Sequence, residues 1–564
     1  MKNNLRAFAR PEKKHVASRR KSLGIALLTL VLAPQAMAIE LQTDNPDLKL
    51  RWDTTLKYSG AFRTDSVDPT LVGRAQANLD DGDRNFSKKG LVSNRLDLFT
   101  EADMVYAQKF GARLSAAAWY DRVYQGSNNN DSPYTSNSLS APSTQFTAAT
   151  RKLHGQQAEM LDAFVFGNVD LGDMRATGRL GKHTVLWGES LFFGANGIAG
   201  GQAPTDLVKL LSVPGSQFKE IIRPVNQVSG QLQVNPELSF GAYYQLEWQS
   251  NRIPAAGSYL SFSDVLDEGG ERLFWSTGSY FQRGQDLKAR DSGQYGVQLR
   301  YRPQELDSEF GFYAIRFHDK GFSSYLRPTA GPGFFANQGA PGARVGDYVL
   351  AYHEGIRAYG ASMSTSVGPA NVGIEVSVRD NTPLVNAGVF AFSPKTDNSA
   401  NPGYPVGRSG HAQISTVVLL SPTALWDGAS LLAEAAWNRR LSITSNAAAL
   451  DANATRDAWG FRVLFTPTYF QVLDGVDISV PIGLGYNPAG RSSVVSLFNG
   501  GIDKGGDFSI GLSGDYRKQV RFGIAYAGFI GKSGAFFAPA NDRLSYQQKY
   551  ADRNFISFNV QSTF

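Results

Sequence analysis

The segment NFISFNVQSTF, residues 554–564, decides the fold. Its side chains alternate over a full strand length, with Phe558 and Val560 on one face and Asn559 and Gln561 on the other. Because successive side chains of a strand point to opposite faces, one set can meet lipid and the other a wet lumen. Short alternating strands also end many soluble proteins, but here the pattern predicts the closing strand of an outer-membrane barrel.

The chain ends on an aromatic residue, Phe564. An aromatic carboxylate after such a strand resembles the signal by which the Gram-negative barrel-assembly machinery recognises its clients. We therefore expect Phe558, Val560 and Phe564 to form an assembly signal, and that machinery to be a partner.

The N-terminus has the three parts of a secretory signal peptide. A basic stretch with Arg19 and Arg20 precedes an apolar run, Leu23 to Ala33, and then Ala36-Met-Ala38. This run of 11 residues is too short for a spanning helix, which needs ~20. We expect residues 1–38 to be cleaved after Ala38, so that 39–564 is an exported barrel in the outer membrane of a Gram-negative bacterium.

Removing this peptide changes the charge balance. Residues 1–38 hold eight of the 56 Lys and Arg residues and one of the 50 Asp and Glu residues, which leaves 48 and 49 in the mature chain. No global basic field remains, so nucleic acid is not an expected partner. With no cysteine in the chain, disulfides and thiolate chemistry are excluded.

Alternating segments recur from about Leu48 to Phe564, and no apolar run after Ala38 reaches the length of a spanning helix. A membrane-spanning chain of this kind must satisfy its backbone by closing a sheet. One example runs from Leu238 to Trp248, and another from Ile478 to Leu484. The polar residues predicted to face the lumen are Arg95, Asp97, Glu101, Asp103, Arg179, Lys182, His183, Gln245 and Glu247.

Turn lengths orient the predicted barrel. Tight turns at 234–238 and 367–372 read as periplasmic, whereas the long polar connections at 127–149, 323–345, 381–409, 445–456 and 531–553 read as extracellular loops. The chain accommodates roughly 16 to 20 strands. The predicted fold is an all-β, large antiparallel transmembrane β-barrel with a lumenal segment that contains a short helix.

That segment, residues 187–222, interrupts the alternation. It joins a glycine-rich stretch, Gly194 to Gly201, to a predicted amphipathic helix with Thr205 as N-cap and Pro214 as its stop. Its apolar content favours a plug or constriction folded into the lumen, although a structured surface loop is the alternative. The constriction candidates are Trp187, Glu189, Asp206, Leu207, Lys209, Leu210, Leu211, Lys219 and Glu220, and the three leucines are expected to pack against the inner wall.

The same region resembles a known family. The runs at 178–190, 204–207, 214–220 and 243–249 are similar to the characteristic block of a proteobacterial family catalogued as domain of unknown function 1302, and the likeness extends over the mature chain. The resemblance implies a porin-like outer-membrane barrel. It also implies a periplasmic lipid-carrier-like partner, an inner-membrane transporter of the resistance-nodulation-division (RND) type, and passage of a hydrophobic or lipid-like molecule.

Catalytic signatures are weak. None of the six histidines lies in H-E-x-x-H, and no G-x-S-x-G elbow occurs. His183 near Glu189 is more often part of a lumenal hydrogen-bond network than of a catalytic site. We expect no enzymatic activity, no metal site and no cofactor.

Three functions stay open. The favoured one is a barrel that carries a hydrophobic or lipid-like molecule and is gated by the internal segment, with outer-membrane lipids as partners. The second is a general or substrate-specific diffusion porin. The third is a surface adhesin or receptor that binds its partner through the long loops.

Overall fold

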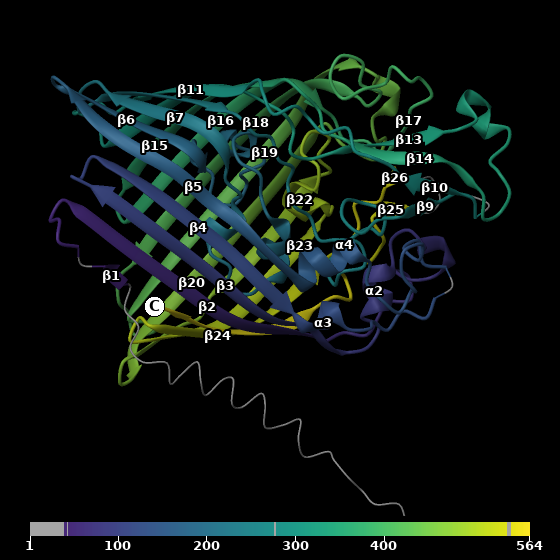
Figure 1. Ribbon diagram of the computed structural model, residues 1–564, viewed down its shortest axis with the longest axis horizontal. Helices are drawn as coiled ribbons and strands as arrows, with labels where there is room; N and C mark the ends of the chain where they lie inside the picture. Colours follow the sequence, from purple (N-terminus) through teal and green to yellow (C-terminus); the bar gives the residue numbers. More distant parts are fainter. Residues whose placement is uncertain (1–38, 42, 133, 276–277, 539–542) are drawn as a thin grey trace, which may run out of the picture.

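The computed structural model describes residues 39–41, 43–132, 134–275, 278–538 and 543–564. The predicted signal peptide lies outside these residues. Figure 1 shows a barrel of tilted antiparallel strands, with short turns at the left and long connections at the right. Within the described ranges, no helix has the length and apolar character needed to cross a membrane.

The barrel closes where the first long strand meets the last. Strand β2 (Leu48–Arg63) pairs antiparallel with β27 (Phe555–Thr563), with Tyr58 level with Val560 and Gly60 level with Phe558. Counting β21 and β22 as one wall strand, the described residues form an 18-strand ring, and the short β1 (Ile39–Leu41) pairs with the start of β2. The prediction of a large all-β barrel of roughly 16 to 20 strands is therefore confirmed.

The other wall strands follow one another along the chain. They are β3 (Gly90–Tyr106), β4 (Phe110–Asp121), β5 (Gln156–Leu171), β6 (Met174–His183), β7 (Val225–Gln233), β8 (Leu238–Gln245), β11 (Gln294–Tyr301), β12 (Ser308–Phe317), β15 (Ile356–Val367), β16 (Ala370–Pro383), β18 (Val406–Leu420), β19 (Gly428–Ser445), β20 (Asp457–Leu473), β21 (Val476–Ser479), β22 (Ile482–Gly490), β23 (Gly505–Tyr516) and β24 (Val520–Ile530).

Two strands are shorter than the alternation predicts. The run from Ile478 to Leu484 is broken at Pro481, between β21 and β22, because proline has no N–H for the ladder. Strand β8 ends at Gln245, and Trp248 turns into the loop core instead of onto the outer face; its ring lies 4.8 Å from that of Tyr352.

The two faces of the wall differ as the period of two predicts. On β3, Leu96 and Leu98 are exposed on the outside, whereas Arg95 and Asp97 are buried on the inside and form an ion pair at 2.7 Å. The closing strand follows the same rule. Ile556 is exposed and Gln561 is buried.

The residues of the proposed assembly signal lie at the closing seam. The ring of Phe558 lies 5.8 Å from that of Tyr58, over Gly60, where a Cβ would come within 2.6 Å of the Phe558 ring. Val560 pairs with Phe522 of β24 on the other side. Phe564 follows the strand, and its backbone N–H donates to the carbonyl of Thr54 at 2.8 Å.

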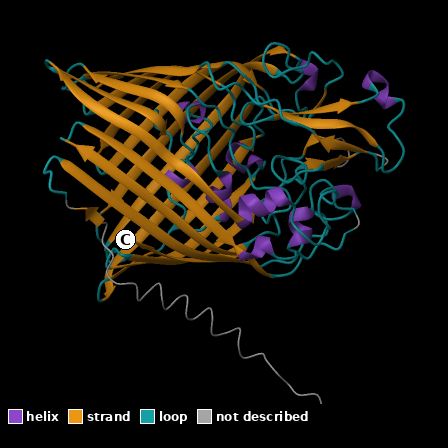
Figure 2. Ribbon diagram, viewed as in Figure 1, coloured by secondary structure: helices purple, strands orange, loops and turns teal. Residues whose placement is uncertain are grey.

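The long connections are folded, which their polar composition did not predict. A five-stranded sheet stands beyond the right-hand end of the barrel in Figures 1 and 2, and the wall and loops there share an aromatic core around Phe281, Phe334 and Tyr348. Its strands are β9 (Arg272–Phe274), β10 (Tyr280–Arg283), β13 (Ser323–Pro328), β14 (Arg344–Ala351) and β17 (Val389–Phe390). A small hairpin pairs β25 (Phe537–Ala538) with β26 (Arg543–Leu544), and the loop helices are η1 (Arg74–Gln76), α2 (Asp81–Asn85), α3 (Arg122–Gln125), α4 (Ala148–Thr150), η2 (Arg151–Gly155), η4 (Gly331–Phe335), η5 (Ala447–Ala449) and η6 (Phe498–Gly501).

Candidate functional site: the segment inside the barrel

The connection between β6 and β7, residues 184–224, is here called the lumenal segment because it contacts inward-facing residues on opposite sides of the barrel. It contains η3 (Ile198–Gly201), α5 (Leu207–Ser212) and α6 (Phe218–Ile221). It leaves β6 and enters β7 at the end that carries the long loops. Short helices and loops accordingly cross the barrel interior in Figure 2.

The first half of the segment is held through its backbone by two wall carboxylates. Glu434 of β19 accepts hydrogen bonds from the N–H groups of Leu191 at 3.1 Å and Phe193 at 3.0 Å, and also from that of Phe192. Glu375 of β16 accepts from the N–H groups of Glu189 at 2.9 Å and Ile198 at 2.7 Å. Bonds from N–H groups to a charged acceptor are stronger than neutral ones.

A guanidinium group of the wall also holds the first half of the segment. Arg379 of β16 donates to three consecutive carbonyl oxygens, those of Ala195, Asn196 and Gly197, at 2.8 to 3.1 Å. The approach is so close that a Cβ at Gly188, which has a φ of 94°, would lie 2.0 Å from Glu375 Oε2. Only glycine fits this backbone position.

The two predicted constriction residues of this half, Trp187 and Glu189, lie against the wall. The Trp187 ring packs edge-on against Tyr243 at 5.0 Å and parallel to Tyr313 at 6.2 Å. Its backbone N–H donates to the side chain of Gln202 at 2.6 Å. The carbonyl of Glu189 accepts from Ser415 Oγ at 2.8 Å.

The second half is held by ion pairs. Asp206 lies 2.5 Å from Arg252, which in turn lies 2.6 Å from Glu159 of β5. Lys209 also reaches Glu159, at 3.4 Å, and lies 5.2 Å from the centre of the Trp119 ring. This cluster of alternating charges is largely buried.

Farther along, Lys219 pairs with Glu101 of β3 at 2.8 Å and lies 4.4 Å from the centre of the Phe99 ring. Glu220 is buried, and its carboxylate accepts from the N–H of Gln217 at 2.9 Å as part of a capping box. Glu101 and Phe99 belong to β3, which lies across the ring from β16 and β19, the strands of Glu375 and Glu434.

The helix differs from the predicted one. Its N-cap is Asp206, whose side chain accepts from Lys209 N–H, and not Thr205. Leu207 packs against the main core, but Leu210 and Leu211 are 53% and 40% exposed, so the prediction that they pack on the wall is wrong. The ion pairs of Asp206 and Lys209 turn Lys209 to Glu159 of the wall and Val208 to Leu153 and Ala255 of the loops. Leu210 and Leu211 are left on the other side of a helix of six residues.

The predicted lumen-facing residues mostly lie on the inner face. Asp103 pairs with Arg113 at 2.6 Å, next to the Arg95–Asp97 and Glu101–Lys219 pairs. Gln245 is buried and donates to the carbonyl of Gln202 in the lumenal segment. Glu247 lies beyond the end of β8 and accepts from Asn226 Nδ2 at 2.9 Å.

The prediction that Lys182 faces the lumen is wrong. Arg179 and His183 both lie against the Phe164 ring, at 5.7 and 5.4 Å. Lys182 is paired with Ala163 at the alternate position, and its Nζ donates to the carbonyl of Met160 at 3.0 Å. Adjacent residues of a strand cannot share a face, so Lys182 does not line the lumen with His183.

Sequence reasoning missed the side chains that hold the segment, namely Glu375, Arg379, Glu434 and Glu159 of the wall and Arg252 of the connection after β8. The available signal was a single charged residue in an otherwise apolar or small-residue strand, as at Ile374-Glu-Val376. The pattern shows that such a residue is on the wet face, but it does not show what it binds there.

The comparisons with known proteins give distant structural similarity. OmpT, an outer membrane protein of Vibrio cholerae, is 10% identical over 93% of this chain and 100% of its own, with a TM-score of 0.37. OccAB2 of Acinetobacter baumannii is 8% identical over 91% and 98%, with a TM-score of 0.39, and OpdK of Pseudomonas aeruginosa with vanillate is 10% identical over 91% and 98%, also at 0.39.

No curated protein matches the sequence. Residues 19–564 match the family described as "Protein of unknown function (DUF1302)". This chain therefore belongs to that family.

Proposed function

We propose that this protein spans the outer membrane of a Gram-negative bacterium and passes a hydrophobic or lipid-like molecule through its lumen, with the lumenal segment as a constriction. The support for a membrane position is the outer face of the wall. Large apolar side chains such as Leu98, Val165, Leu180, Val228 and Phe240 are exposed there. A polar inside and an apolar outside are the arrangement of outer-membrane barrels.

One observation carries the choice of substrate. The lumenal segment keeps several large apolar side chains exposed while its polar groups are used in contacts with the wall. The exposed ones are Leu191 at 39%, Phe192 at 37%, Leu210 at 53%, Leu211 at 40% and Phe218 at 63%. Apolar surface left open inside a barrel offers contact area to an apolar ligand, at about 25 cal/mol per Å² removed from water.

The diffusion porin is the second candidate. The inner face of β3 carries Arg95, Asp97, Glu101 and Asp103, and neighbouring charges pair with them. A charged wall of this kind favours a wet path for hydrophilic solutes. The two functions differ in what enters the lumen, which an experiment can separate.

The first test changes the apolar surface alone. We expect the double substitution Leu210→Gln and Leu211→Gln to lower, several-fold, both the lipid that copurifies with the barrel and the passage of a fluorescent fatty-acid probe into proteoliposomes. Lipid is measured by mass spectrometry against an unrelated barrel purified alongside. The matched control is Leu306→Gln with Leu425→Gln, two exposed leucines in short turns, which should leave both readouts unchanged.

Equal lipid content and equal probe passage in the two double variants would overturn the lipid-like substrate. A large ion conductance in planar bilayers, unaffected by either variant, would favour the diffusion porin instead.

The second test concerns the constriction. Deleting Gly194 to Gly215 removes α5 and its ion pairs but leaves the wall pairing intact. We expect a large, steady single-channel current where the intact protein conducts poorly. An unchanged conductance in a folded deletion variant would contradict the constriction.

The proposal also covers export, membrane insertion and the supply of substrate. The chain would be exported by its signal peptide, inserted by the barrel-assembly machinery, and supplied with substrate by a periplasmic lipid-carrier-like protein and an RND-type transporter. We expect it to have no enzymatic activity.

A further inference from the structure

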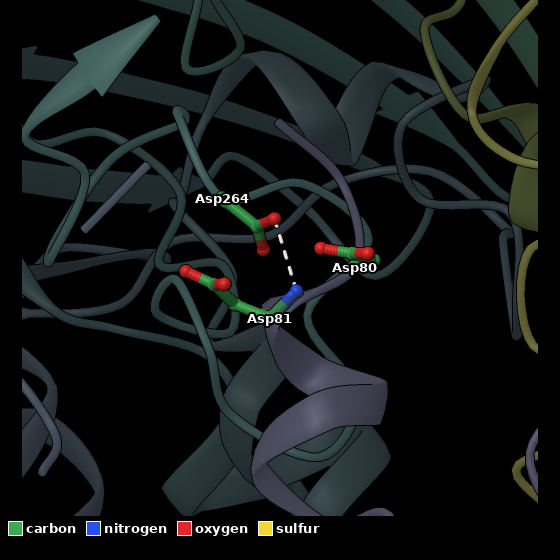
Figure 3. Close-up of side chains that lie close together, drawn as sticks. All are labelled: Asp80, Asp81 and Asp264. Atoms are coloured by element: carbon green, nitrogen blue, oxygen red, sulfur yellow. Dashed lines mark hydrogen bonds between the residues drawn. The ribbon is translucent and has the colours of Figure 1, made fainter. Parts of the chain in front are cut away.

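Three buried carboxylates converge in the loops at the long-loop end of the barrel. Asp80 and Asp81 lie at the start of α2, in the connection between β2 and β3, and Asp264 comes from the connection between β8 and β11. One oxygen from each carboxylate lies within 4.8 Å of the others, and all three residues are at most 2% exposed. Figure 3 shows the three side chains close together.

Among the described residues, a basic side chain pairs with only one of the three carboxylates. Arg84 pairs with Asp80 at 2.7 Å. Across the part of the chain that the structure describes, no ion pair involves Asp81 or Asp264. The nearby Arg553 is engaged by Asp83 at 2.8 Å and by the carbonyl of Tyr259 at 2.9 Å. Unpaired buried charges are costly, so the carboxylates need a counter-charge or a proton.

The hydrogen bonds around Asp81 suit an ionised carboxylate. Thr135 Oγ1 and the side-chain amides of Asn130 and Asn137 all donate to it, the amides at 3.3 and 3.1 Å. These three donors come from the connection between β4 and β5. Asp264 Oδ2 accepts from the backbone N–H of Asp81 at 3.0 Å.

The remaining oxygens point to a ligand. Asp80 Oδ1 and Asp264 Oδ1 are fully buried, and no described residue forms a hydrogen bond with either oxygen. Both residues are 0% exposed, and their free oxygens belong to the carboxylates that converge in Figure 3. Buried acceptors without a donor are rare in native proteins, and an ion is one of the few groups that satisfies them.

We propose that Asp80, Asp81 and Asp264 bind a divalent cation, and that this cation is Ca²⁺. The cluster offers only oxygen ligands, which suit hard cations. One oxygen from each carboxylate lies within 4.8 Å of the other two. Ca²⁺ accepts such oxygens at about 2.3 to 2.6 Å in a flexible geometry, whereas Mg²⁺ demands near-ideal octahedral geometry at about 2.0 to 2.1 Å.

The position of the site gives it a structural role. Its ligands and their hydrogen-bond donors come from three separate loops, 64–89, 122–155 and 246–293. Asn137 already links two of them, because its Nδ2 donates both to Asp81 and to the carbonyl of Asp264. A bound Ca²⁺ fastens these three loops to one another at the mouth of the barrel.

The test uses the full mature chain, refolded in detergent without lipopolysaccharide, whose own calcium would interfere. Binding of ⁴⁵Ca²⁺ is measured by equilibrium dialysis, with EDTA-treated protein as the starting material. We expect about one ion per chain with a Kd of about 10⁻⁴ to 10⁻³ M, the range of extracellular calcium sites. We also expect Ca²⁺ to slow proteolysis of the three loops, and Mg²⁺ at equal concentration to have a weaker effect.

The double variant Asp80→Asn with Asp264→Asn keeps side-chain size and removes two charges. We expect it to bind Ca²⁺ at least 10-fold more weakly and to show the same proteolysis with and without Ca²⁺. Asp131→Asn, an exposed carboxylate in the loop at 122–155, should behave like the wild type. Two results would overturn the proposal: no saturable binding to the wild-type protein up to 10 mM Ca²⁺ (about ten times the weak end of that range), or equal binding by the double variant and the wild type. Either result would mean that the site does not exist and that the carboxylates are neutralised by protonation.

Discussion

The two halves of the lumenal segment are attached to the barrel in different ways. Residues 187–198 are held through their backbone by Glu375, Arg379 and Glu434. Residues 206–220 are held mainly by side-chain ion pairs, together with one backbone bond from Leu207 N–H to the carbonyl of Arg252 at 2.8 Å. A backbone attachment tolerates most substitutions within the segment but depends on the wall. A side-chain attachment depends on single residues of the segment and, where it is exposed, on salt.

The largest effect should come from the wall side of the first half. Glu434→Ala leaves three backbone N–H groups and Ser190 Oγ without their acceptor, and each unsatisfied buried donor costs about 1 to 3 kcal/mol. We expect amide hydrogen exchange of residues 189–198 to accelerate at least about 100-fold, measured by mass spectrometry in detergent.

Glu237→Ala, in the short turn between β7 and β8, is the control and should not change this exchange. Slow exchange in a folded Glu434→Ala protein would show that the first half does not depend on the wall carboxylate.

The next effect should come from within the second half. Asp206→Asn retains the helix cap but loses the charge facing Arg252, and we expect it to loosen α5 by about 1 to 2 kcal/mol. Because the chain has no cysteine, Leu210→Cys can carry a spin label there, and its mobility should rise in the Asp206→Asn background. Equal mobility would mean that packing, and not the ion pair, holds the helix.

A smaller effect is expected at the exposed end of the second half. Lys219 is 40% exposed at its side chain, so Lys219→Met should change the unfolding free energy by only about 0.2 to 1 kcal/mol. The difference from wild type, measured by urea unfolding in detergent, should shrink in 0.5 M salt. A difference that is independent of salt would show that the methylene stem, over Phe99, matters more than the charge.

A pH-dependent effect is expected at Lys320, whose Nζ donates to the carbonyl of Gly201, where the two halves meet, at 2.9 Å. Burial lowers the pKa of Lys320 to about 8. Since the folded pKa lies below the unfolded one, the unfolded state binds more protons between these values, and stability from this group rises with pH there. The wild-type protein should therefore gain stability relative to Lys320→Met between pH 7.5 and 9.5, and a constant difference would contradict this.

The wall could be predicted from sequence because its physics is local. A period of two fixes which side chains of β3 and β27 face outward, and turn length fixes the orientation of the ring. The two strands that are shorter than predicted have equally local causes, which the alternation alone does not show. Pro481 removes a donor from the ladder, and Trp248 follows the last paired residue of β8.

The interior could be predicted only in part. The break in alternation after His183 locates the segment, but the helical pattern wrongly predicts that Leu210 and Leu211 pack on the wall, because apolar residues on a helix usually cover a core. Their orientation is set by Asp206 and Lys209, whose partners come from β5 and from the connection after β8. Contacts between residues so distant in the chain are not encoded in any local pattern.

The closing seam has a consequence for how the molecule forms. Thr55 and Thr563 are hydrogen-bonded at 2.9 Å, although they are 508 residues apart in the chain. Proteins dominated by such non-local pairing fold slowly, and until β2 meets β27 each presents an unpaired edge that another chain can extend. The period before closure is therefore the time at which this protein is most prone to aggregate.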